Sequence, residues 1–346
     1  PIKMPPARGD VAPSLALSYS SAGGAGVAGF GWSLSVPFIA RQTDKGVPRY
    51  KDGAAGAFSS DQDRFVFGGG QELVPICVIE AGACPVAVGE TMPAWATGWM
   101  YFRARVEGAY LRFFWSPDRK TWRVLDKAGN GMELGVPLDG TGDPNALEAD
   151  PALPARIFRW NLARQYDVND AAAVNTGSTA TPKPVNPVVY RYATVEGTAY
   201  LTDVFDTPPA SNASGSATSA FAHHVSIAYE SRPDTSFSFR RRYRAADTQR
   251  VARVDVTSKG ADAVSGRALV RRYHLGYEDG LTVSRLQSVT VEGRCATEVA
   301  ETASGALPAS SCPSSRMSSE GASGRKTRAT RPTPFRRPRS RTAPPP

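Results

Sequence analysis

The chain has 346 residues, enough to bury one large core or two ordinary ones. Its net charge of +9 lies almost entirely at the end: residues 314–346 hold nine Lys and Arg and one acid, which leaves about +1 for residues 1–313. A nucleic-acid groove needs clustered Lys and Arg on folded elements, and only Arg240, Arg241 and Arg242 come close in the body, where a solvated strand end explains them. The composition therefore indicates no nucleic-acid partner. No apolar run reaches the ~18 residues of a membrane helix, so no membrane span is expected.

Alternating apolar and polar residues predict β-strands along most of the chain. A period of two places every second side chain on one face of a strand. The first strands are expected around Leu15 and Tyr19 and around Trp32. Later strands are expected at residues 102–106, 110–115, 122–125, 157–166, 188–192, 200–205, 225–229, 251–256, 269–277 and 286–291. Many carry charge on the alternate face, which is typical of an antiparallel sheet with one wet side.

Turn-forming residues separate these segments. Glycine and asparagine supply the positive φ that tight hairpins need, as at residues 68–70, 126–131 and 279–280. No stretch shows sustained 3.6-residue periodicity with helix caps. The sequence thus predicts an all-β protein of consecutive antiparallel hairpins with little helix. Residues 135–155, 171–187 and 207–220 are expected to be surface loops.

The four cysteines form two near pairs, Cys77 with Cys84 and Cys295 with Cys312. Neither pair has the C-x-x-C spacing of a zinc or redox site, and the three histidines are scattered. No metal or cofactor site is predicted. The pairs either form disulfides, closing loops of about 8 and 18 residues, or remain free buried thiols.

No catalytic constellation is found. The sequence lacks a G-x-S-x-G elbow, an H-E-x-x-H pair and a P-loop. Residues 24–29 formally match G-x-G-x-x-G, but they lie between two alternating segments, where a hairpin turn is the ordinary use of such glycines. Trp32, Trp115, Trp122 and Trp160 fall on strand faces that need a core. We expect no catalytic residues and no enzyme.

Residues 314–346 differ from the rest. They contain no Val, Ile or Leu and are dominated by Arg, Pro, Ser and Thr, so they cannot bury enough surface to offset ordering. We predict a disordered tail, either a natural basic linker or a frame-shifted reading of GC-rich DNA. The chain begins at Pro1 rather than Met, and we expect the natural start to be missing.

The first fifty residues carry an ordered series of motifs: PPARG at 5–9, PSLALSYSS at 13–21, GFGWSLS at 29–35 and IARQTDKGVPRY at 39–50. This series closely resembles the start of the N-terminal domain of the Salmonella plasmid virulence protein B (SpvB) family, which is shared with the B components of insecticidal Tc toxins. One departure is Ala25, where the family usually has Asn. The motif residues expected to have structural roles are Leu15, Tyr19, Gly29, Gly31, Trp32 and Tyr50, together with Trp160 in RIFRWNL. Trp32 is expected to be buried, with Gly29 and Gly31 allowing close approach of the backbone.

The resemblance extends to SRLQSV at 284–289 and to the pair Cys295 and Cys312, so it implies a β domain over residues 1–313. It implies a non-catalytic module of a secreted toxin or virulence protein, extracellular after release from the cytoplasm, that contributes to a shell enclosing or delivering a C-terminal toxic segment. The implied partners are downstream shell or propeller domains and Tc A- and C-type subunits. The ADP-ribosyltransferase that follows the domain in the Salmonella protein needs an E-x-E site, which this sequence lacks. The alternative is a carbohydrate-binding or adhesion β-sandwich.

Overall fold

The computed structural model describes residues 1–52, 62–76, 93–96, 98–138, 143–168, 184–209, 217–260, 266–309 and 312–318. Within them helix is limited to the single 3-10 turns η1 (Ala94–Ala96), η2 (Pro144–Ala146) and η3 (Thr218–Ala220). The strands are β1 (Leu17–Tyr19), β2 (Ala25–Gly26), β3 (Gly29–Phe30), β4 (Trp32–Leu34), β5 (Phe38–Arg41), β6 (Phe65–Phe67), β7 (Gln71–Pro75), β8 (Met100–Ala104), β9 (Arg112–Trp115), β10 (Thr121–Leu125), β11 (Gly131–Gly135), β12 (Leu147–Asp150), β13 (Leu153–Tyr166), β14 (Val188–Val195), β15 (Thr198–Asp206), β16 (His223–Ser238), β17 (Ala245–Ser258), β18 (Ala268–Tyr277), β19 (Leu286–Glu292) and β20 (Ser314–Ser318). The predicted fold class, all-β with consecutive antiparallel hairpins, is confirmed.

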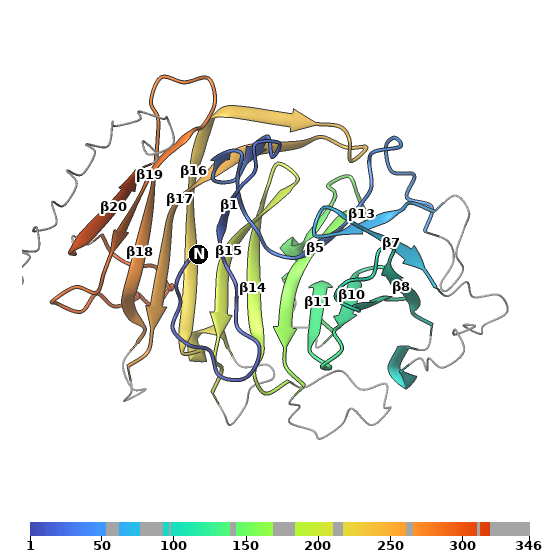
Figure 1. The fold of residues 1–346 in the computed structure, drawn as a ribbon, viewed down its shortest axis with the longest axis horizontal. Helices are drawn as coiled ribbons and strands as arrows, with labels where there is room; N and C mark the ends of the chain where they lie inside the picture. The colour runs from blue at the N-terminus through green and yellow to red at the C-terminus, as the bar shows by residue number, and fades with distance from the viewer. Residues whose placement is uncertain are drawn as a thin grey trace, which may run out of the picture.

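Among the described strands, eight close on themselves into an antiparallel ring, seen at the right of Figure 1. Their order is β5, β6, β7, β8, β9, β10, β11 and β13, and β13 pairs with both β11 and β5. The 14 residues of β13 make this closure possible, because its last part pairs with β11 while residues 159–161 pair with β5. Closure leaves no free edge among the eight strands.

Aromatic side chains fill the ring. Phe65, Trp115, Trp122 and Trp160 are fully buried. The indoles of Trp115 and Trp122 stack with centroids 5.2 Å apart, and Phe65 meets both edge-on. Such offset and edge-to-face contacts stabilise aromatic clusters beyond the area that they bury. The alternation that places these residues on one face of each strand is therefore the cause of the ring's core.

An open antiparallel sheet continues from the ring. It begins at β13 and runs through β14, β15, β16, β17, β18, β19 and β20, toward the left of Figure 1. β16 and β17, of 16 and 14 residues, form a hairpin that extends past the end of β15. One cluster of buried apolar side chains runs from the ring into this sheet, so the two parts share a core.

The N-terminal segment lies along the open sheet. Ile2 donates its backbone N–H to Leu15, and Lys3 donates to the hydroxyl of Tyr273 in β18. Two small pairings, β1 with β4 and β2 with β3, then turn the chain toward β5. The glycine-rich segment at 24–29 is a hairpin turn, as its flanking residues predicted. The first fifty residues thus tie the open sheet to the ring.

Three expectations are wrong in part. Residues 147–150, expected in a loop, form β12, because β13 offers them a strand to pair with. Ser314–Ser318, expected in the disordered tail, pair with β19 as β20, since the backbone of an edge strand pairs with little regard to sequence. Trp32 is half-buried rather than buried, because it lies in the small β1–β4 sheet, where it packs against the core on one side and against the exposed Tyr19 on the other. The remainder of the tail lies outside the described residues.

Candidate functional site

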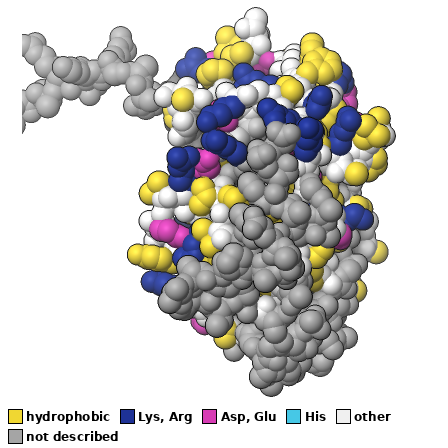
Figure 2. Space-filling model, turned by 90° about the vertical axis from the view of Figure 1, so that its right-hand side faces the viewer, with side chains coloured by type: hydrophobic (Ala, Val, Ile, Leu, Met, Phe, Trp, Pro, Cys, Tyr) yellow, Lys and Arg dark blue, Asp and Glu magenta, His cyan; other side chains and the backbone are white. Residues whose placement is uncertain are grey.

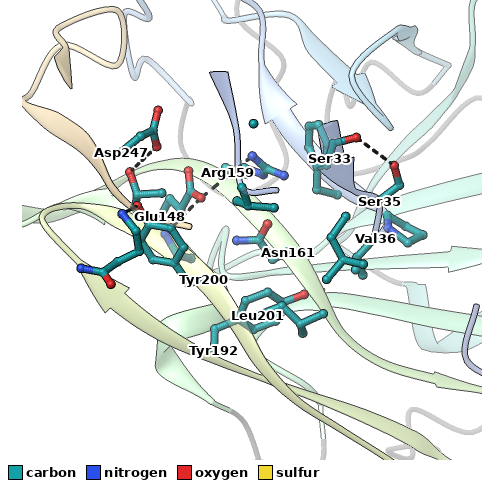
Figure 3. Close-up of a pocket in the computed structure, with 18 of the residues that line it drawn as sticks. Ser33, Ser35, Val36, Glu148, Arg159, Asn161, Tyr192, Tyr200, Leu201 and Asp247 are labelled. Carbon is teal, nitrogen blue, oxygen red and sulfur yellow. Dashed lines mark hydrogen bonds and ion pairs between the residues drawn. The ribbon is translucent and has the colours of Figure 1, made fainter. Parts of the chain in front are cut away.

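A cavity of about 620 Å³ lies where the main parts of the fold meet (Figure 3). One wall comes from the N-terminal hairpins, including Ser33, Ser35 and Val36. The others come from β12 and β13 of the ring side, from β14 and β15, and from the β16–β17 hairpin. A cavity at such a junction is the default place to look for a binding site.

Glu148 of β12 joins three of these walls. Its side chain is 1% exposed. Arg241, from the tip of the β16–β17 hairpin, places Nη1 2.8 Å from Oε2, and Arg159 of β13 places Nη1 4.0 Å from Oε1. The backbone N–H of Ala199 donates to Oε1 at 3.3 Å. Because a buried carboxylate needs such partners, Glu148 fixes the hairpin tip and β15 against the ring.

Arg159 carries the least compensated charge of the cavity wall. Its guanidinium lies 3.6 Å from the ring centroid of Phe38, and its Nε has no hydrogen-bond partner. Burial lowers the pKa of Arg159, and the nearby Glu148 opposes that effect. An arginine keeps its charge under such conditions, so this side of the cavity favours a polar or anionic group.

Three tyrosines complete the wall with hydroxyls committed to the backbone. Tyr192 donates to Leu162 at 2.8 Å and Tyr229 donates to Leu201 at 2.8 Å. Burial raises the pKa of Tyr192, Tyr200 and Tyr229. These phenols therefore stay neutral. Among the described lining residues there is no His or Cys, and the arrangement offers hydrogen bonds and ion pairs rather than an activated nucleophile.

A second constellation centres on Arg41, which sequence reasoning did not single out. The guanidinium is fully buried and contacts both carboxylate oxygens of Asp52 at 2.6 Å and one of Asp63 at 2.8 Å. Its Nε donates to the carbonyl of Ile157 in β13. The sequence feature that could have pointed to Arg41 was its place in the motif IARQTDKGVPRY at residues 39–50.

Two of the expected structural residues meet at Arg41. The ring centroids of Tyr50 and Trp160 lie 4.7 and 5.5 Å from its guanidinium carbon. Trp160 is buried in the ring, while Tyr50 is half-buried and donates its hydroxyl to the carbonyl of Arg241 at 2.6 Å. Burial, the largest influence, raises the pKa of Tyr50 to about 12, so this donor stays protonated.

The remaining motif residues lie apart from Arg41. Tyr19 is 60% exposed and packs its ring against Trp32, 5.2 Å away. Gly31 has φ of 78°, and a Cβ there would lie 2.6 Å from the ring of Tyr19. Leu15, in the N-terminal segment, has its side chain buried in the main core. None of these four residues lines the cavity of about 620 Å³.

Gly29 connects the second small hairpin to the open sheet. Its φ is 103°, and a Cβ there would lie 2.8 Å from the carbonyl oxygen of Ser284. The next residue, Phe30, donates its N–H to that same carbonyl at 2.7 Å. A glycine therefore permits the hairpin to hydrogen-bond to the β18–β19 connection.

Cys295 and Cys312 are joined by a disulfide, with Cα atoms 4.8 Å apart. Cys312 packs with Leu269 and Leu307 in a small buried cluster at the end of the open sheet. Cys77 and Cys84 lie outside the described residues. Across the described chain, no group of three or more His, Cys, Asp and Glu side chains is placed to hold a metal ion. The same residues include no helix of the length and apolarity needed to cross a membrane.

The chain is similar to known proteins in both sequence and fold. The family model for the Salmonella virulence plasmid 65kDa B protein matches residues 1–174. The mono(ADP-ribosyl)transferases SpvB of Salmonella typhimurium and Salmonella dublin are each 43% identical over 156 residues, which is 43% of this chain and 24% of theirs. This chain thus spans about a quarter of the length of the curated relatives that it matches.

Solved structures agree on the fold over most of the chain. The N-terminal domain of effector protein SpvB from Salmonella typhimurium strain LT2 superposes with a TM-score of 0.60 at 19% identity, covering 83% of this chain and 95% of that one. The TcdB2-TccC3 structure gives 0.61 at 17% identity, covering 89% of this chain and 15% of that one. A Tc holotoxin pore of Photorhabdus luminescens gives 0.58 over 86% of this chain and 14% of its own.

The closed ring and the open sheet that grows from it define the class of this protein: an all-β module with the fold of the SpvB N-terminal domain and of the matching part of TcdB2-TccC3. Because the family model matches half of the chain, the family is established. The chain belongs to the Salmonella virulence plasmid 65kDa B protein (SpvB) family.

Proposed function

We propose that this chain is a non-catalytic structural module of a secreted toxin or virulence protein. Its role is to form part of a β-shell that encloses or delivers a C-terminal toxic segment. The relatives named mono(ADP-ribosyl)transferase match over a quarter of their length, and the solved domain with this fold is the N-terminal one. An E-x-E site is absent from the sequence.

The observation that carries the proposal is the path of the sheet. Among the described strands the ring is closed, but the sheet that leaves it through β13 is open and ends at β20, where Met317 is 63% exposed. An open edge with apolar surface is a template for further strands. The likeness to TcdB2-TccC3 over 89% of this chain supports the same interpretation.

The partners and the location follow from the proposal. Further shell or propeller domains of the same protein would continue the sheet, and Tc A- and C-type subunits would assemble with it. Release to the extracellular space would follow synthesis in the cytoplasm. A domain boundary at about Pro313 is part of the same proposal, although β20 carries the sheet to Ser318.

Light scattering on the isolated chain tests the proposal. We expect concentration-dependent self-association, which Met317→Lys reduces by placing a charge at the sheet edge. The matched control is Val106→Lys, an exposed position on the ring side, which should leave association unchanged. A monodisperse monomer at all concentrations would count against a shell module and in favour of an independent domain.

The carbohydrate-binding alternative is not supported. That function needs exposed aromatic rings over a groove, and all six tryptophans are buried or half-buried. Trp115, Trp122 and Trp160 lie inside the ring, where no ligand reaches them.

A further inference from the structure

The end of the β16–β17 hairpin presents a surface that a shell module does not require. A break in register between Ser231 and Ser236 bends β16 beyond the part that pairs with β15. The hairpin then runs across the top of the molecule toward the ring in Figure 1. We define the tip surface as Val47, Phe237, Phe239, Arg240, Arg242 and Arg244.

The tip is held in place from several sides. Arg242 closes the turn by donating its N–H to the carbonyl of Phe239 at 2.8 Å. Arg241 donates to the carbonyl of Gly197 at 2.9 Å, and its own carbonyl accepts the hydroxyl of Tyr50. Tyr243 is buried beneath the turn. The side chains of the tip surface are therefore displayed on a fixed backbone rather than on a loose loop.

Two aromatic rings on this backbone face solvent. Phe237 and Phe239 are 66% and 59% exposed, and their centroids lie 6.0 Å apart in an edge-to-face arrangement. Val47, in the loop that accepts a hydrogen bond from Arg242 at Pro48, is 54% exposed. Paired exposed aromatics on rigid backbone are characteristic of interaction surfaces, where they become buried on binding.

The charges of the tip surface are three arginines, one of which is paired with a glutamate. Arg244 pairs with Glu196 at 2.6 Å, and its guanidinium carbon lies 5.6 Å from the ring centroid of Phe237. Arg240 and Arg242 are exposed and have no carboxylate partner among the described residues. Figure 2 looks from the side toward which the hairpin points and shows Lys and Arg side chains beside hydrophobic ones at the upper end. The surface thus carries two uncompensated positive charges next to two exposed rings.

We propose that the tip surface binds an acidic protein segment, whose carboxylates pair with Arg240 and Arg242 and whose apolar side chains cover Phe237 and Phe239. Arginine rather than lysine favours a protein partner, because the planar guanidinium takes a carboxylate in two parallel hydrogen bonds and arginine is enriched at protein interfaces. An anionic membrane surface is the other chemistry with this charge, but attraction to it grows with larger polybasic clusters than this one.

Fluorescence polarisation with the whole chain tests the proposal. The probe is a short fluorescein-labelled peptide of Glu, Asp, Leu and Gly, and its matched control replaces every acid by Gln or Asn. We expect the acidic probe alone to bind, with an affinity that falls as salt is raised. Arg240→Glu with Arg242→Glu, and separately Phe237→Ser with Phe239→Ser, should each weaken binding by about tenfold or more.

The control variants are Arg294→Glu and Tyr110→Ser, an exposed arginine and an exposed aromatic ring elsewhere on the molecule, which should bind as the unaltered chain does. Unchanged thermal melting shows that the tip variants are folded. Equal binding of the two peptides, an equal loss in the control variants, or no binding would overturn the proposal. The alternative outcome is that the chain associates more tightly with vesicles of phosphatidylcholine and phosphatidylserine than with the peptide. If that association is lost when both phenylalanines are replaced, the surface is assigned to a membrane.

Discussion

Arg41 and Asp52 form a two-pronged ion pair inside the fold: Nη1 and Nη2 of the guanidinium each lie 2.6 Å from a different carboxylate oxygen. The arginine side chain is fully buried and that of Asp52 is 14% exposed. Asp63 takes a second contact with Nη1 and also accepts the backbone N–H groups of Arg49 and Tyr50. The pair thereby ties the segment at 49–52 to strand β5 of the ring.

Arg41→Met is expected to lower the free energy of unfolding by about 3–5 kcal/mol, because it leaves two carboxylates at a buried site without their cation. Urea denaturation followed by tryptophan fluorescence measures the change. The control is Arg105→Met, since Arg105 is 62% exposed and its contact with Glu72 is a surface ion pair. That variant should lie within about 0.5 kcal/mol of the unaltered chain. Equal effects at the two positions would show that burial of Arg41 does not decide its contribution.

The sequence predicted most of the strands but not the two ways in which they assemble. Alternation located β9, β10 and β13 closely, because Trp115, Trp122 and Trp160 place one face of each strand in the core of the ring. It could not show that β13 closes a ring, since closure depends on pairing with β5, over a hundred residues earlier. β6 was missed because three residues give too little periodicity, and β12 was missed because it lies among the loop-forming residues at 135–155.

The polar clusters were hidden for a different reason. Glu148 appears in the sequence among loop-forming residues, and its partner Arg241 is distant along the chain. Arg159 follows more closely, but it faces Glu148 only because β12 pairs with β13. Only the fold brings them to the cavity. Trp32 shows the opposite error, since an aromatic residue in an alternating segment was expected to be buried and is instead paired with the exposed Tyr19.

Gly29→Ala is expected to destabilise the chain by about 1–3 kcal/mol, since φ of 103° disfavours an L side chain and the new Cβ would lie 2.8 Å from the carbonyl oxygen of Ser284. Thermal melting by circular dichroism measures the change. The matched control is Gly70→Ala, because φ of Gly70 is not positive and an added Cβ would have no neighbouring atom within 4 Å. Its stability should be unchanged or slightly raised. Similar losses in both variants would remove the special role of Gly29.

Cys312→Ser is expected to lower the free energy of unfolding by about 3 kcal/mol, because the disulfide to Cys295 closes a loop across 17 positions. The loop also docks on the sheet, where Glu301 donates its N–H to the carbonyl of Arg267 at 2.8 Å. Hydrogen exchange at the Glu301 amide should therefore become faster in the variant. Unchanged exchange there would mean that docking does not depend on the disulfide.

His224 provides a pH-dependent link between the open sheet and that loop. The side chain is 3% exposed, with Nδ1 2.9 Å from Glu301 and Nε2 2.8 Å from Asp203. Its ring stacks on Phe205, and Glu301 also contacts Thr257 and Arg267. Burial alone would lower the pKa of His224, but the hydrogen bonds to the two carboxylates outweigh it and raise the pKa above its ordinary value. The pKa of Glu301 is held below its usual range by the hydrogen bonds from His224 and Thr257, against burial, which would raise it.

The sign of the pH dependence follows from these directions. A histidine with a raised pKa in the folded state contributes stability that is complete below its unfolded value of about 6.5 and is lost as pH rises through the folded pKa. The contribution of Glu301 is present above its ordinary pKa and is lost in acid as pH falls through its lowered value. Between these limits the link is strongest, so the part of the stability due to His224 should decline from mildly acidic to alkaline pH.

Urea midpoints of the unaltered chain and of His224→Gln, measured from mildly acidic to alkaline pH, test this link. We expect the unaltered chain to lose stability relative to the variant as pH rises above about 6.5, by up to about 1.4 kcal/mol for each unit by which the pKa is raised. Glu301→Gln should reduce the same slope, because it removes one of the two carboxylates that favour the imidazolium. Parallel pH profiles for all three proteins would show that the pKa of His224 is the same in the folded and unfolded states. A slope of opposite sign would mean that burial, rather than the carboxylates, sets its pKa.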